Sequence, residues 1–415
     1  MRAILAPEIA SSTIGPEAEA ILRSCVHCGF CNAVCPTYQI RGDERDGPRG
    51  RIYLMKAMLE GEAVGETTQR HLDRCLTCRA CESACPSGVR YARLTELVKP
   101  KLERDVARPA GKRLFRWLLR RVMSDAGRAG ALIGLGRAVR GLLPDRLARW
   151  VPASRDPGAW PEPRHARRLL CLTGCVQASA APRINAAAAR VLDRLGTSLV
   201  RVPGTVCCGA LPYHLGHADE ARTFARANID AWWPAIEAGA AGVFSASSGC
   251  SAMLRDYADL LADDPHYCER AARVAELALD ASSAVTAAEL AAALPSQSPG
   301  CAGRIAFQPP CTLQHALRAP GRVEAALEVA GFELTQRAGL ESCCGSAGTY
   351  SLLQPELANE LRTRRLAHLA TGAPEAIASA NIGCMLHLER ESNVPVRHWI
   401  ELVDEAWPGR ARPSE

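Results

Sequence analysis

Apolar residues in the first third of the chain recur at helical spacing. Residues 52–59 follow a turn rich in Gly, Pro and Asp, and their pattern predicts a short amphipathic helix. Further along, one helical face is apolar and arginines stand between its members, which are Leu114, Trp117, Leu118 and Val122. This second pattern predicts an amphipathic, cationic helix.

The second half of the chain contains short apolar runs instead. Four of these runs predict strands, each leading toward a cysteine, within residues 167–174, 241–250, 304–310 and 375–384. Alanine-rich segments such as residues 182–196 lie between them and predict helices. Strands that alternate with helices are typical of α/β domains. The cysteines should therefore gather outside the carboxyl ends of the strands, where open α/β sheets keep their sites.

The cysteines of this half form two matching sets. The gaps within the sets are 32, 1 and 42 residues in the first and 32, 1 and 40 in the second, and both contain Cys-Cys-Gly. Such agreement indicates an internal duplication. The first set is Cys175, Cys207, Cys208 and Cys250, and the second is Cys311, Cys343, Cys344 and Cys384.

Four thiolates at one sheet edge repel each other unless a cation or cluster is present. We therefore expect at least one set to hold a third centre, iron–sulfur or zinc, with a structural motif of packed thiols as the alternative. Cys171, Cys268 and Cys301 have no counterparts in the duplication. We expect these three to be buried small hydrophobic residues rather than ligands.

The composition is that of an ordinary globular protein, with 48% hydrophobic and 23% charged residues among 415. We find no run of 18 uncharged apolar residues, and the N-terminus lacks the apolar core of a secretory signal. We therefore expect a cytoplasmic protein whose thiols stay reduced. Nineteen cysteines in a reducing compartment indicate metal binding rather than disulfides.

The net charge of +6 is unevenly distributed. Residues 101–170 contain 17 Lys and Arg against 6 Asp and Glu, a local excess of +11. The cationic helix predicted there either lies on the next domain with solvated arginines or docks on an anionic membrane face or an acidic partner. Nucleic acid is not expected as a partner, because the sequence contains nothing similar to a base-reading module.

Two cysteine runs near the N-terminus carry the strongest chemical signal. Both read C-x2-C-x2-C-x3-C-P, and every position is offset by 50. In such runs the first three thiolates hold one 4Fe–4S cluster and the fourth reaches the neighbouring cluster. We therefore assign two crossed ligand sets, with zinc as the less favoured metal. Cluster 1 takes Cys25, Cys28, Cys31 and Cys85, and cluster 2 takes Cys75, Cys78, Cys81 and Cys35.

These patterns together predict an α+β multidomain protein. A helical, bacterial-type ferredoxin domain with two 4Fe–4S clusters is followed by two duplicated α/β Cys-Cys-Gly domains. We expect an N-terminal tail at residues 1–20, the ferredoxin domain at 21–105 and a basic helical connector at 106–166. The two Cys-Cys-Gly domains should occupy residues 167–300 and 301–415.

The cysteine plan resembles a known group of proteins, the iron–sulfur subunits of glycolate oxidase, anaerobic glycerol-3-phosphate dehydrogenase, lactate-utilisation and heterodisulfide reductase complexes. Several segments are similar to one family of this group, the glycolate oxidase iron–sulfur subunits. They include "LRSCVHCGFCNAVCPTYQIRGDERDGPRGRIYLMK", "HLDRCLTCRACESACPSGVRY", "NIDAWWPAIEAGA", "PCTLQHA" and "CCGSAGTYSL". The resemblance extends over about residues 20 to 405 and is weakest at 105–165.

The resemblance implies an electron-transfer subunit of a flavin-dependent glycolate dehydrogenase, which oxidises glycolate to glyoxylate and, in some relatives, D-lactate. Flavin-containing partner subunits would take the hydride, and this chain would pass single electrons to a membrane quinone. It implies no catalytic residue in this chain. The local excess of +11, with Leu and Trp between the arginines, predicts peripheral attachment to the cytoplasmic face of the inner membrane through the connector and partner contacts. The residues agree on one point, because no G-x-G-x-x-G follows a predicted strand and no flavin is expected here.

Three alternatives remain open at this point. The chain could serve a related complex, acting on glycerol 3-phosphate, lactate or a heterodisulfide. It could be a free-standing reductase, or a zinc-stabilised scaffold that only assembles other subunits. Heterodisulfide reductase-type domains end each copy in C-x2-C, whereas Met253 and His387 occupy the second of those positions here. A non-cubane cluster is therefore not assigned; His387 is either a substitute ligand or, more commonly, a surface or core histidine.

Overall fold

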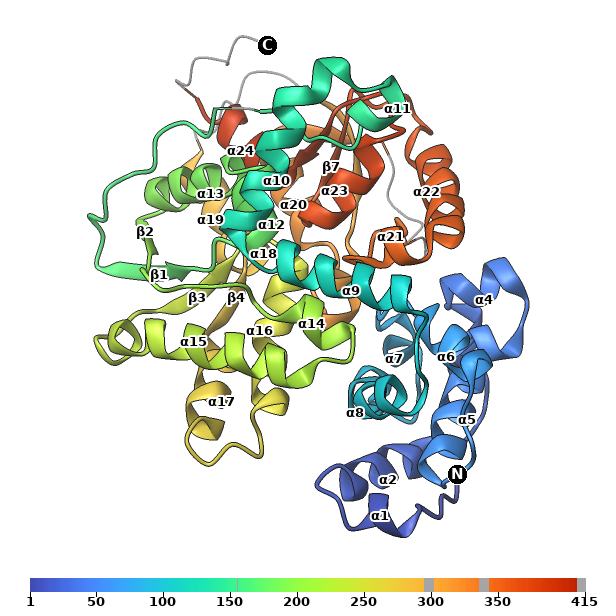
Figure 1. Ribbon diagram of the computed structural model, residues 1–415. Coiled ribbons are helices and arrows are strands. Elements are labelled where there is room, and N and C mark those ends of the chain that lie inside the picture. The colour runs from blue at the N-terminus through green and yellow to red at the C-terminus, as the bar shows by residue number, and fades with distance from the viewer. Residues whose placement is uncertain (155, 295–301, 336–342, 409–415) are drawn as a thin grey trace.

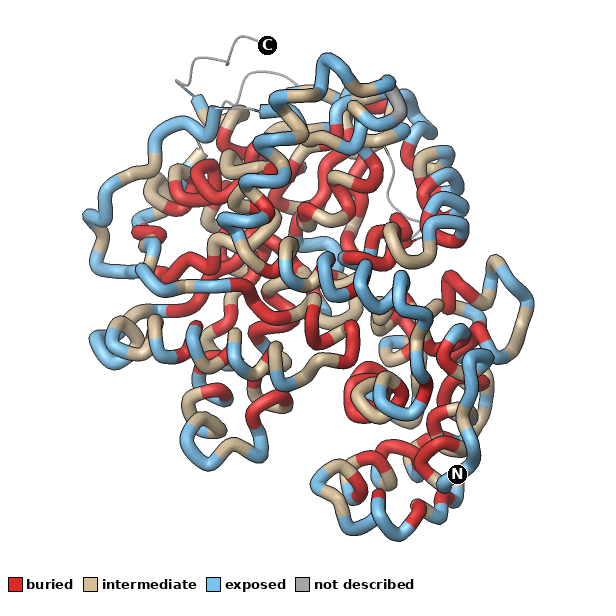
Figure 2. Tube along the Cα trace, viewed as in Figure 1, coloured by how far each residue is buried: buried red, intermediate tan, exposed pale blue. Residues whose placement is uncertain are grey.

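The computed structural model describes residues 1–154, 156–294, 302–335 and 343–408. A helical N-terminal part lies beside a larger part that contains two sheets, and the connector runs over the junction between them (Figure 1). Buried residues concentrate inside both parts, and the outer sides of the peripheral helices are exposed (Figure 2). The expected fold class is confirmed.

The N-terminal part consists of short helices around the two cysteine runs. The helix predicted at residues 52–59 is confirmed as the last two thirds of α5. Residues 1–20, expected as a tail, form α1 and most of α2, and Ala6, Ile9 and Ala18 are buried in one core with Met55 of α5. The helices are α1 (Pro7–Ala10), α2 (Gly15–Ser24), α3 (Phe30–Ala33), α4 (Pro36–Arg41), η1 (Glu44–Asp46), α5 (Pro48–Leu59), α6 (Glu66–Asp73), α7 (Ala80–Ser83) and α8 (Tyr91–Asp105).

The connector is helical, as predicted. It comprises α9 (Ala110–Met123), α10 (Ala126–Val139), η2 (Arg140–Leu142) and α11 (Asp145–Ala148). The helix α10 packs on α12 of the following domain. Within the described residues, no helix is both long enough and apolar enough to cross a bilayer.

Two four-stranded parallel sheets follow, and they have the same strand order. The first runs β2-β1-β3-β4, and the second runs β6-β5-β7-β8. Matching order supports the duplication read from the cysteines. The strands are β1 (Arg167–Cys171), β2 (Thr197–Arg201), β3 (Gly242–Ser245), β4 (Ala278–Asp280), β5 (Gly303–Gln308), β6 (Phe332–Leu334), β7 (Ala376–Ser379) and β8 (Val396–His398). All four predicted strands are confirmed as β1, β3, β5 and β7.

Helices cover these sheets in an arrangement that repeats between the copies. Those of the first copy are α12 (Cys175–Ala180), α13 (Arg183–Arg194), α14 (Ala210–His214), α15 (Ala218–Glu237), α16 (Ser248–Leu260), α17 (Cys268–Leu277), α18 (Ala281–Ala284) and α19 (Ala287–Ala293). Those of the second are η3 (Thr312–Ala316), α20 (Arg322–Val329), α21 (Tyr350–Leu353), α22 (Pro355–Leu369), α23 (Ile382–Glu389) and α24 (Trp399–Ala406).

The two copies share one hydrophobic core, because their outer helices pack against each other. The first long helix of one copy packs on the last helix of the other: α13 contacts α24, and α20 contacts α19. Trp399, fully buried, belongs to the same core as residues of the first sheet. Hydrogen bonds also cross between the copies, from Ser248 N to Ala380 O at 3.2 Å and from the His398 side chain, at Nε2, to Ala246 O at 2.9 Å.

The cysteines without counterparts take different positions. Cys171 is fully buried in β1, as expected for a small hydrophobic residue. Cys268 differs from the expectation, because it is only half-buried at the first position of α17. Cys301 lies outside the described residues.

Candidate metal centres

The four cysteines assigned to cluster 1 line one small pocket. Its walls include Cys25, Cys28, Cys31 and Cys85, and its volume is about 30 Å³. Cys25 is buried, whereas Cys28 is exposed at the surface of the molecule. The structure therefore brings the fourth cysteine of the second run to the first three of the first run.

The four cysteines assigned to cluster 2 line a second pocket of about 20 Å³, formed by Cys35, Cys75, Cys78 and Cys81. Cys81 also contributes to the pocket of cluster 1, so the two sites are direct neighbours. Each crossed set, three cysteines of one run with the fourth of the other, therefore lines a single pocket. The assignment of iron to these sets stays a prediction.

Unusual backbone geometry shapes both cysteine loops. The residues between the cysteines have positive φ at equivalent positions, 57° at His27 and 87° at Gly29 in the first loop, and 52° at Thr77 and 62° at Arg79 in the second. In each loop, residues with left-handed backbone conformation alternate with residues of ordinary conformation. This alternation turns successive backbone N–H groups toward the same side, where they can donate to an anionic cluster. The Thr77 N–H, for example, donates to Cys75 Sγ at 3.4 Å. Gly29 has a further constraint, because a Cβ there would lie 2.6 Å from Arg49 Nη1.

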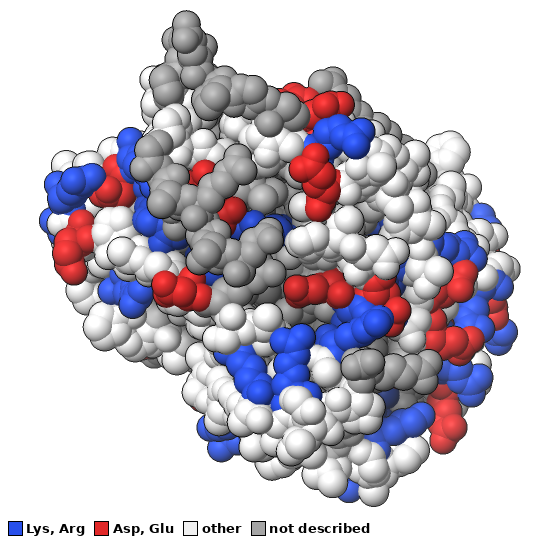
Figure 3. Space-filling model, turned by 90° about the horizontal axis from the view of Figure 1, so that it is seen from above, with Lys and Arg blue, Asp and Glu red and all other residues white. Residues whose placement is uncertain are grey.

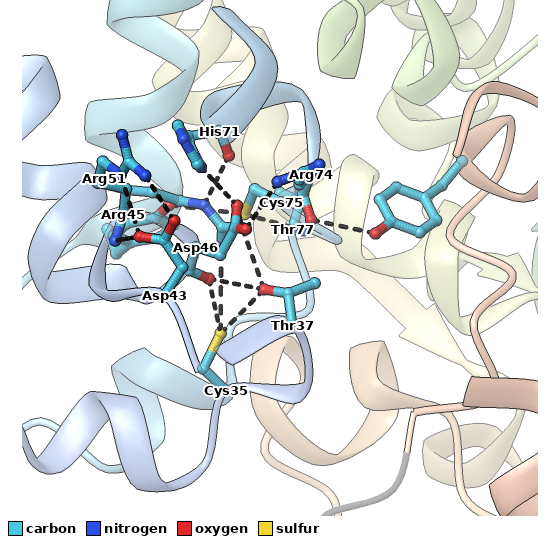
Figure 4. A network of polar contacts seen from close by, with 12 residues as sticks. Cys35, Thr37, Asp43, Arg45, Asp46, Arg51, His71, Arg74, Cys75 and Thr77 are labelled. Carbon is cyan, nitrogen blue, oxygen red and sulfur yellow. Dashed lines mark hydrogen bonds and ion pairs between the residues drawn. The ribbon is translucent and has the colours of Figure 1, made fainter. Parts of the chain in front are cut away.

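A buried cation accompanies the cluster 2 site (Figure 4). Arg51 is 1% exposed; its Nη1 lies 3.9 Å from Cys35 Sγ, and its Nε donates to His71 O at 2.8 Å. Burial alone would lower the pKa of Arg51, but Cys75 and the other anionic groups around it raise that pKa above its usual value. Arg51 therefore remains a full positive charge beside the thiols.

Asp46 anchors that cation. Its carboxylate lies 3.6 Å from Arg51 Nη2, 2.8 Å from His71 Nδ1 and 2.8 Å from Arg74 Nη1. Asp46, Asp43 and His71 also have the mutual spacing of a metal site, but the arginines already occupy the Asp46 oxygens. This group fixes Arg51 rather than an ion.

Burial favours the protonated form of three of these thiols, those of Cys31, Cys78 and Cys81. Burial raises the pKa of Cys31 to about 11, with the neighbouring Cys25 adding to the effect. Burial also raises the pKa values of Cys78 and Cys81 well above the ordinary value. A bound metal deprotonates its thiol ligands outright, so loading these sites must release protons.

The first Cys-Cys-Gly set converges at the carboxyl ends of its strands. Cys175 and Cys207 have their sulfur atoms 3.4 Å apart, and the N–H of Gly209 donates to Cys207 Sγ at 3.5 Å. The hydrogen bond between Cys207 and Cys175 lowers the pKa of Cys207 well below its ordinary value. The set, with Cys208 and Cys250, lines a cavity of about 370 Å³.

The second set is more deeply enclosed. Cys343 and Cys344 are buried, and the N–H of Gly345 donates to Cys343 Sγ at 3.4 Å. The pKa of Cys311 is raised well above its ordinary value, mainly by its hydrogen bond with Cys343 and, to a lesser extent, by burial. Cys311 and Cys343 of this set are thus within hydrogen-bonding reach of each other, as Cys175 and Cys207 are in the first set. Arg365, 1% exposed, lies within electrostatic range of all four thiols of this set; burial lowers its pKa, and the thiols oppose that change.

The residues in place of the missing fifth cysteines are buried. Met253 and His387 are 1% and 2% exposed, and both line the large cavity. His387 Nε2 lies 3.2 Å from Ala358 O, so this nitrogen carries the proton, and burial lowers the pKa of His387 to about 4. His387 is therefore a neutral core histidine in this structure, the commoner of the two expectations.

The connector does not face its neighbours as the charge pattern suggested. Arg116 of α9 is buried and pairs with Glu103 at 3.1 Å, and Arg120 pairs with Glu220. The apolar residues point outward instead: Leu114, Phe115, Trp117 and Leu118 are 44–57% exposed. On the face seen in Figure 3, basic and acidic side chains occur in mixed groups, with wide areas that carry neither. Arg116 and Arg120 thus attach α9 to the protein.

Sequence reasoning missed the buried arginines. Arg51 lies on the inward face of α5 with Met55 and Met58, at the spacing i, i+4, i+7. An arginine on the apolar stripe of a helix was the available signal. Arg365 is likewise buried on α22 with Leu361 and Leu369.

Comparison with known families defines the class of protein. Residues 21–89 match the model described as a 4Fe-4S dicluster domain, and residues 169–255 and 305–389 match the model of a cysteine-rich domain. The fold and the cysteine sites therefore define an iron–sulfur protein in which a dicluster domain precedes two cysteine-rich domains.

Individual relatives narrow this class. The glycolate oxidase iron-sulfur subunit of Escherichia coli (strain K12) is 47% identical over 98% of this chain and 99% of that protein. The probable glycolate oxidase iron-sulfur subunit of Bacillus subtilis (strain 168) is 31% identical over 94% of each chain. Lactate utilization protein A of Shouchella clausii (strain KSM-K16) is 26% identical over 54% of this chain and 92% of that protein. The chain belongs to the family of glycolate oxidase iron–sulfur subunits, which confirms the resemblance drawn from its motifs.

Proposed function

We propose that this chain is the electron-transfer subunit of a flavin-dependent glycolate dehydrogenase. Flavin-containing partner subunits oxidise glycolate to glyoxylate, and this chain carries the electrons to a membrane quinone. Two 4Fe–4S clusters, held by the crossed cysteine sets, supply one-electron chemistry when bound. Hydride chemistry belongs to the partners.

One observation carries the proposal: the thiol sites form a continuous series. The pockets of clusters 1 and 2 share Cys81, and the pocket of cluster 2 shares Cys75 with the large cavity between the Cys-Cys-Gly copies. Cys78 also packs beside Cys343 and Cys311 of the second copy. A series of adjacent redox sites suits electron transfer and is unnecessary for a scaffold.

The exposure of the thiols favours one direction along this series. Cys28 is the exposed member of cluster 1, and the neighbouring Val26 and Phe30 are 65% and 63% exposed. An apolar surface beside an exposed cluster ligand suits a docked flavoprotein. Electrons would then enter at cluster 1 and leave from the Cys-Cys-Gly part.

A third redox centre in that part completes the proposal. Eight further thiols converge at strand ends, and the second set has a buried counter-charge in Arg365. The second set is the better candidate for this centre, because it lies beside Cys78 of cluster 2. Zinc in either set would leave it outside the electron path.

We further propose that α9 brings the chain to the membrane as a peripheral protein. Its outer face carries Leu114, Phe115, Trp117 and Leu118, with Lys112 and Arg113 exposed beside them. An apolar helix face with flanking cations is the pattern of interfacial helices. The cytoplasmic face of the inner membrane is the location that this attachment implies.

The test uses the complex purified anaerobically with its flavoprotein partners. We expect glycolate-dependent reduction of a short-chain quinone by the complex and none by this chain alone. A Cys75→Ser variant should abolish quinone reduction while the flavoproteins still reduce an artificial dye. Glycolate oxidation by this chain alone, or undiminished quinone reduction by the flavoproteins alone, would refute the proposal.

A further inference from the structure

The cavity of about 370 Å³ lies where four parts of the chain meet. Its walls come from α6 and α8 of the ferredoxin part, α9 of the connector, and the strand ends of both Cys-Cys-Gly copies. Cys75 of cluster 2 and Cys250 of the first copy stand on its walls, and so does Cys384 of the second copy. The cavity therefore adjoins every site downstream of cluster 1.

Its size exceeds what a cluster needs. The pockets bounded by the ferredoxin cysteines measure about 20 and 30 Å³, whereas this cavity measures about 370 Å³. A centre held by the first Cys-Cys-Gly set would occupy only the wall where those cysteines stand. The remaining space falls in the range of pockets that bind small organic molecules, about 300–1,000 Å³.

The lining of the cavity is mainly apolar. Leu353 of α21 and Leu386 of α23 contribute half-buried side chains, and Met253 contributes a buried one. Aliphatic walls with a few placed polar groups suit a flat, largely apolar ring whose polar atoms lie at its edges.

Two polar groups on the lining are left without partners. The Oε1 atom of Gln177 and the Nδ1 atom of His387 are buried and have no hydrogen-bond partner among the described residues. The Gln177 amide is oriented by its Nε2, which donates to Asn185 Oδ1 at 2.7 Å. Because His387 Nε2 carries the ring proton, both free atoms are acceptors. A buried acceptor without a donor costs about 1–3 kcal/mol, so a ligand that brings hydroxyl groups is favoured.

We infer that this cavity is the reduction site of a quinone, and that Gln177 and His387 accept hydrogen bonds from the hydroxyl groups of the hydroquinone product. This inference rests on the proposed function and adds the place where the acceptor binds. The acceptors match the reduced ring, which carries O–H donors, better than the oxidised ring, which carries only carbonyl oxygens. The site therefore favours reduction.

The reaction balances without another reagent. Two electrons reach the ring one at a time through the adjacent thiol-held centres, which are oxidised in turn. Two protons from water add to the two carbonyl oxygens, and the quinone becomes a hydroquinone. The electrons come originally from the 2-hydroxy acid oxidised by the flavoproteins.

The position of α9 gives the acceptor a route. Arg116 and Met123 on the inner side of α9 line the cavity, while Leu114 and Trp117 on its outer side are exposed. A lipid-soluble ring that reaches the outer face of α9 is thus one helix away from the cavity. A single element joins the membrane-facing surface to the site.

The test fills the cavity in the purified complex with its flavoproteins. Leu353→Trp and Leu386→Trp should each lower kcat/KM for a short-chain quinone by roughly tenfold or more, because the bulkier ring takes the ligand's space. Glycolate-dependent reduction of a dye that accepts electrons from the flavoproteins should stay within about twofold, with iron content unchanged. Leu135→Trp, on the exposed side of α10, is the matched control and should change neither activity.

Unchanged quinone reduction in both tryptophan variants would overturn the cavity assignment alone. A wild-type complex that reduces the dye but no quinone would instead refute the proposed function. Photolabelling of the wild-type complex with an azidoquinone gives an answer that does not depend on the variants folding. We expect label on residues 346–354 or 381–390, and label confined to other segments would overturn the inference.

Discussion

Arg51 should set the reduction potential of cluster 2. Its Nη1 lies 3.9 Å from Cys35 Sγ, and a unit charge at this distance is worth about 4 kcal/mol at an effective dielectric of 20. An added electron spreads over the whole cluster, and Asp46, 3.6 Å from Arg51, opposes the cation. After these two effects, the cation should stabilise the reduced cluster by about 2 kcal/mol. This free energy corresponds to roughly 80 mV for a one-electron couple.

Arg51→Gln should therefore lower the potential of cluster 2 by roughly 80 mV, because a reduced cluster loses the cation that stabilises it. Redox titration followed by EPR measures the potentials of both clusters in the same sample. Arg51→Lys keeps the charge and should restore more than half of the shift.

Arg49→Gln is the matched control. Arg49 adjoins cluster 1, but its side chain is 36% exposed, so solvent screens its charge and the shift at cluster 1 should be small. The reasoning is refuted if Arg51→Gln, with both clusters assembled and the unfolding temperature close to wild type, leaves the potential of cluster 2 within about 20 mV of its original value.

Three other predictions test the remaining sites. Cys85→Ser should perturb the EPR signal of the cluster held by Cys25, Cys28 and Cys31; selective loss of the other cluster would show that the ligands are not crossed. A fully reconstituted chain should contain about twelve irons, falling to about eight in the Cys343→Ser/Cys344→Ser double variant, whereas eight in the wild type would leave the Cys-Cys-Gly cysteines without a cluster. Leu114→Ser/Trp117→Ser should release the complex from anionic vesicles at a lower salt concentration than wild type, and unchanged flotation would exclude α9 as the anchor.

Cysteine spacing predicted most of the fold. Exact spacing restricts which thiols can meet, and the runs before Cys175 and Cys311 have the length and polarity of buried parallel strands. The duplication, the strand positions and the order of domains could therefore be read from the chain.

The orientation of α9 could not be predicted, because its inward face is determined by partners that are distant in sequence. Arg116 and Arg120 pair with Glu103 and Glu220, and the second of these stands 100 residues away. Helical periodicity predicts that a helix has an apolar and a polar face, but it does not predict which face packs on a neighbouring element. The pairs lie at a domain junction, where local patterns carry no information about the partner.

The large cavity was equally hidden from the sequence. It exists because the ferredoxin part and both copies meet around it, and its lining residues lie between Leu72 and Arg390. The unpartnered atoms of Gln177 and His387 become informative only once the packing around them is known.

The packing of outer helices between the copies bears on the origin of the chain. The helix α13 packs on α24, and α20 packs on α19, so each copy contacts the other through its first long helix and its last helix. A single-copy ancestor with these surfaces would have paired with itself through a self-complementary interface, as two-fold homodimers do. Joining two such copies in one chain makes the pairing independent of protein concentration. It also allows the two halves to differ, and one carries Met253 where the other carries His387.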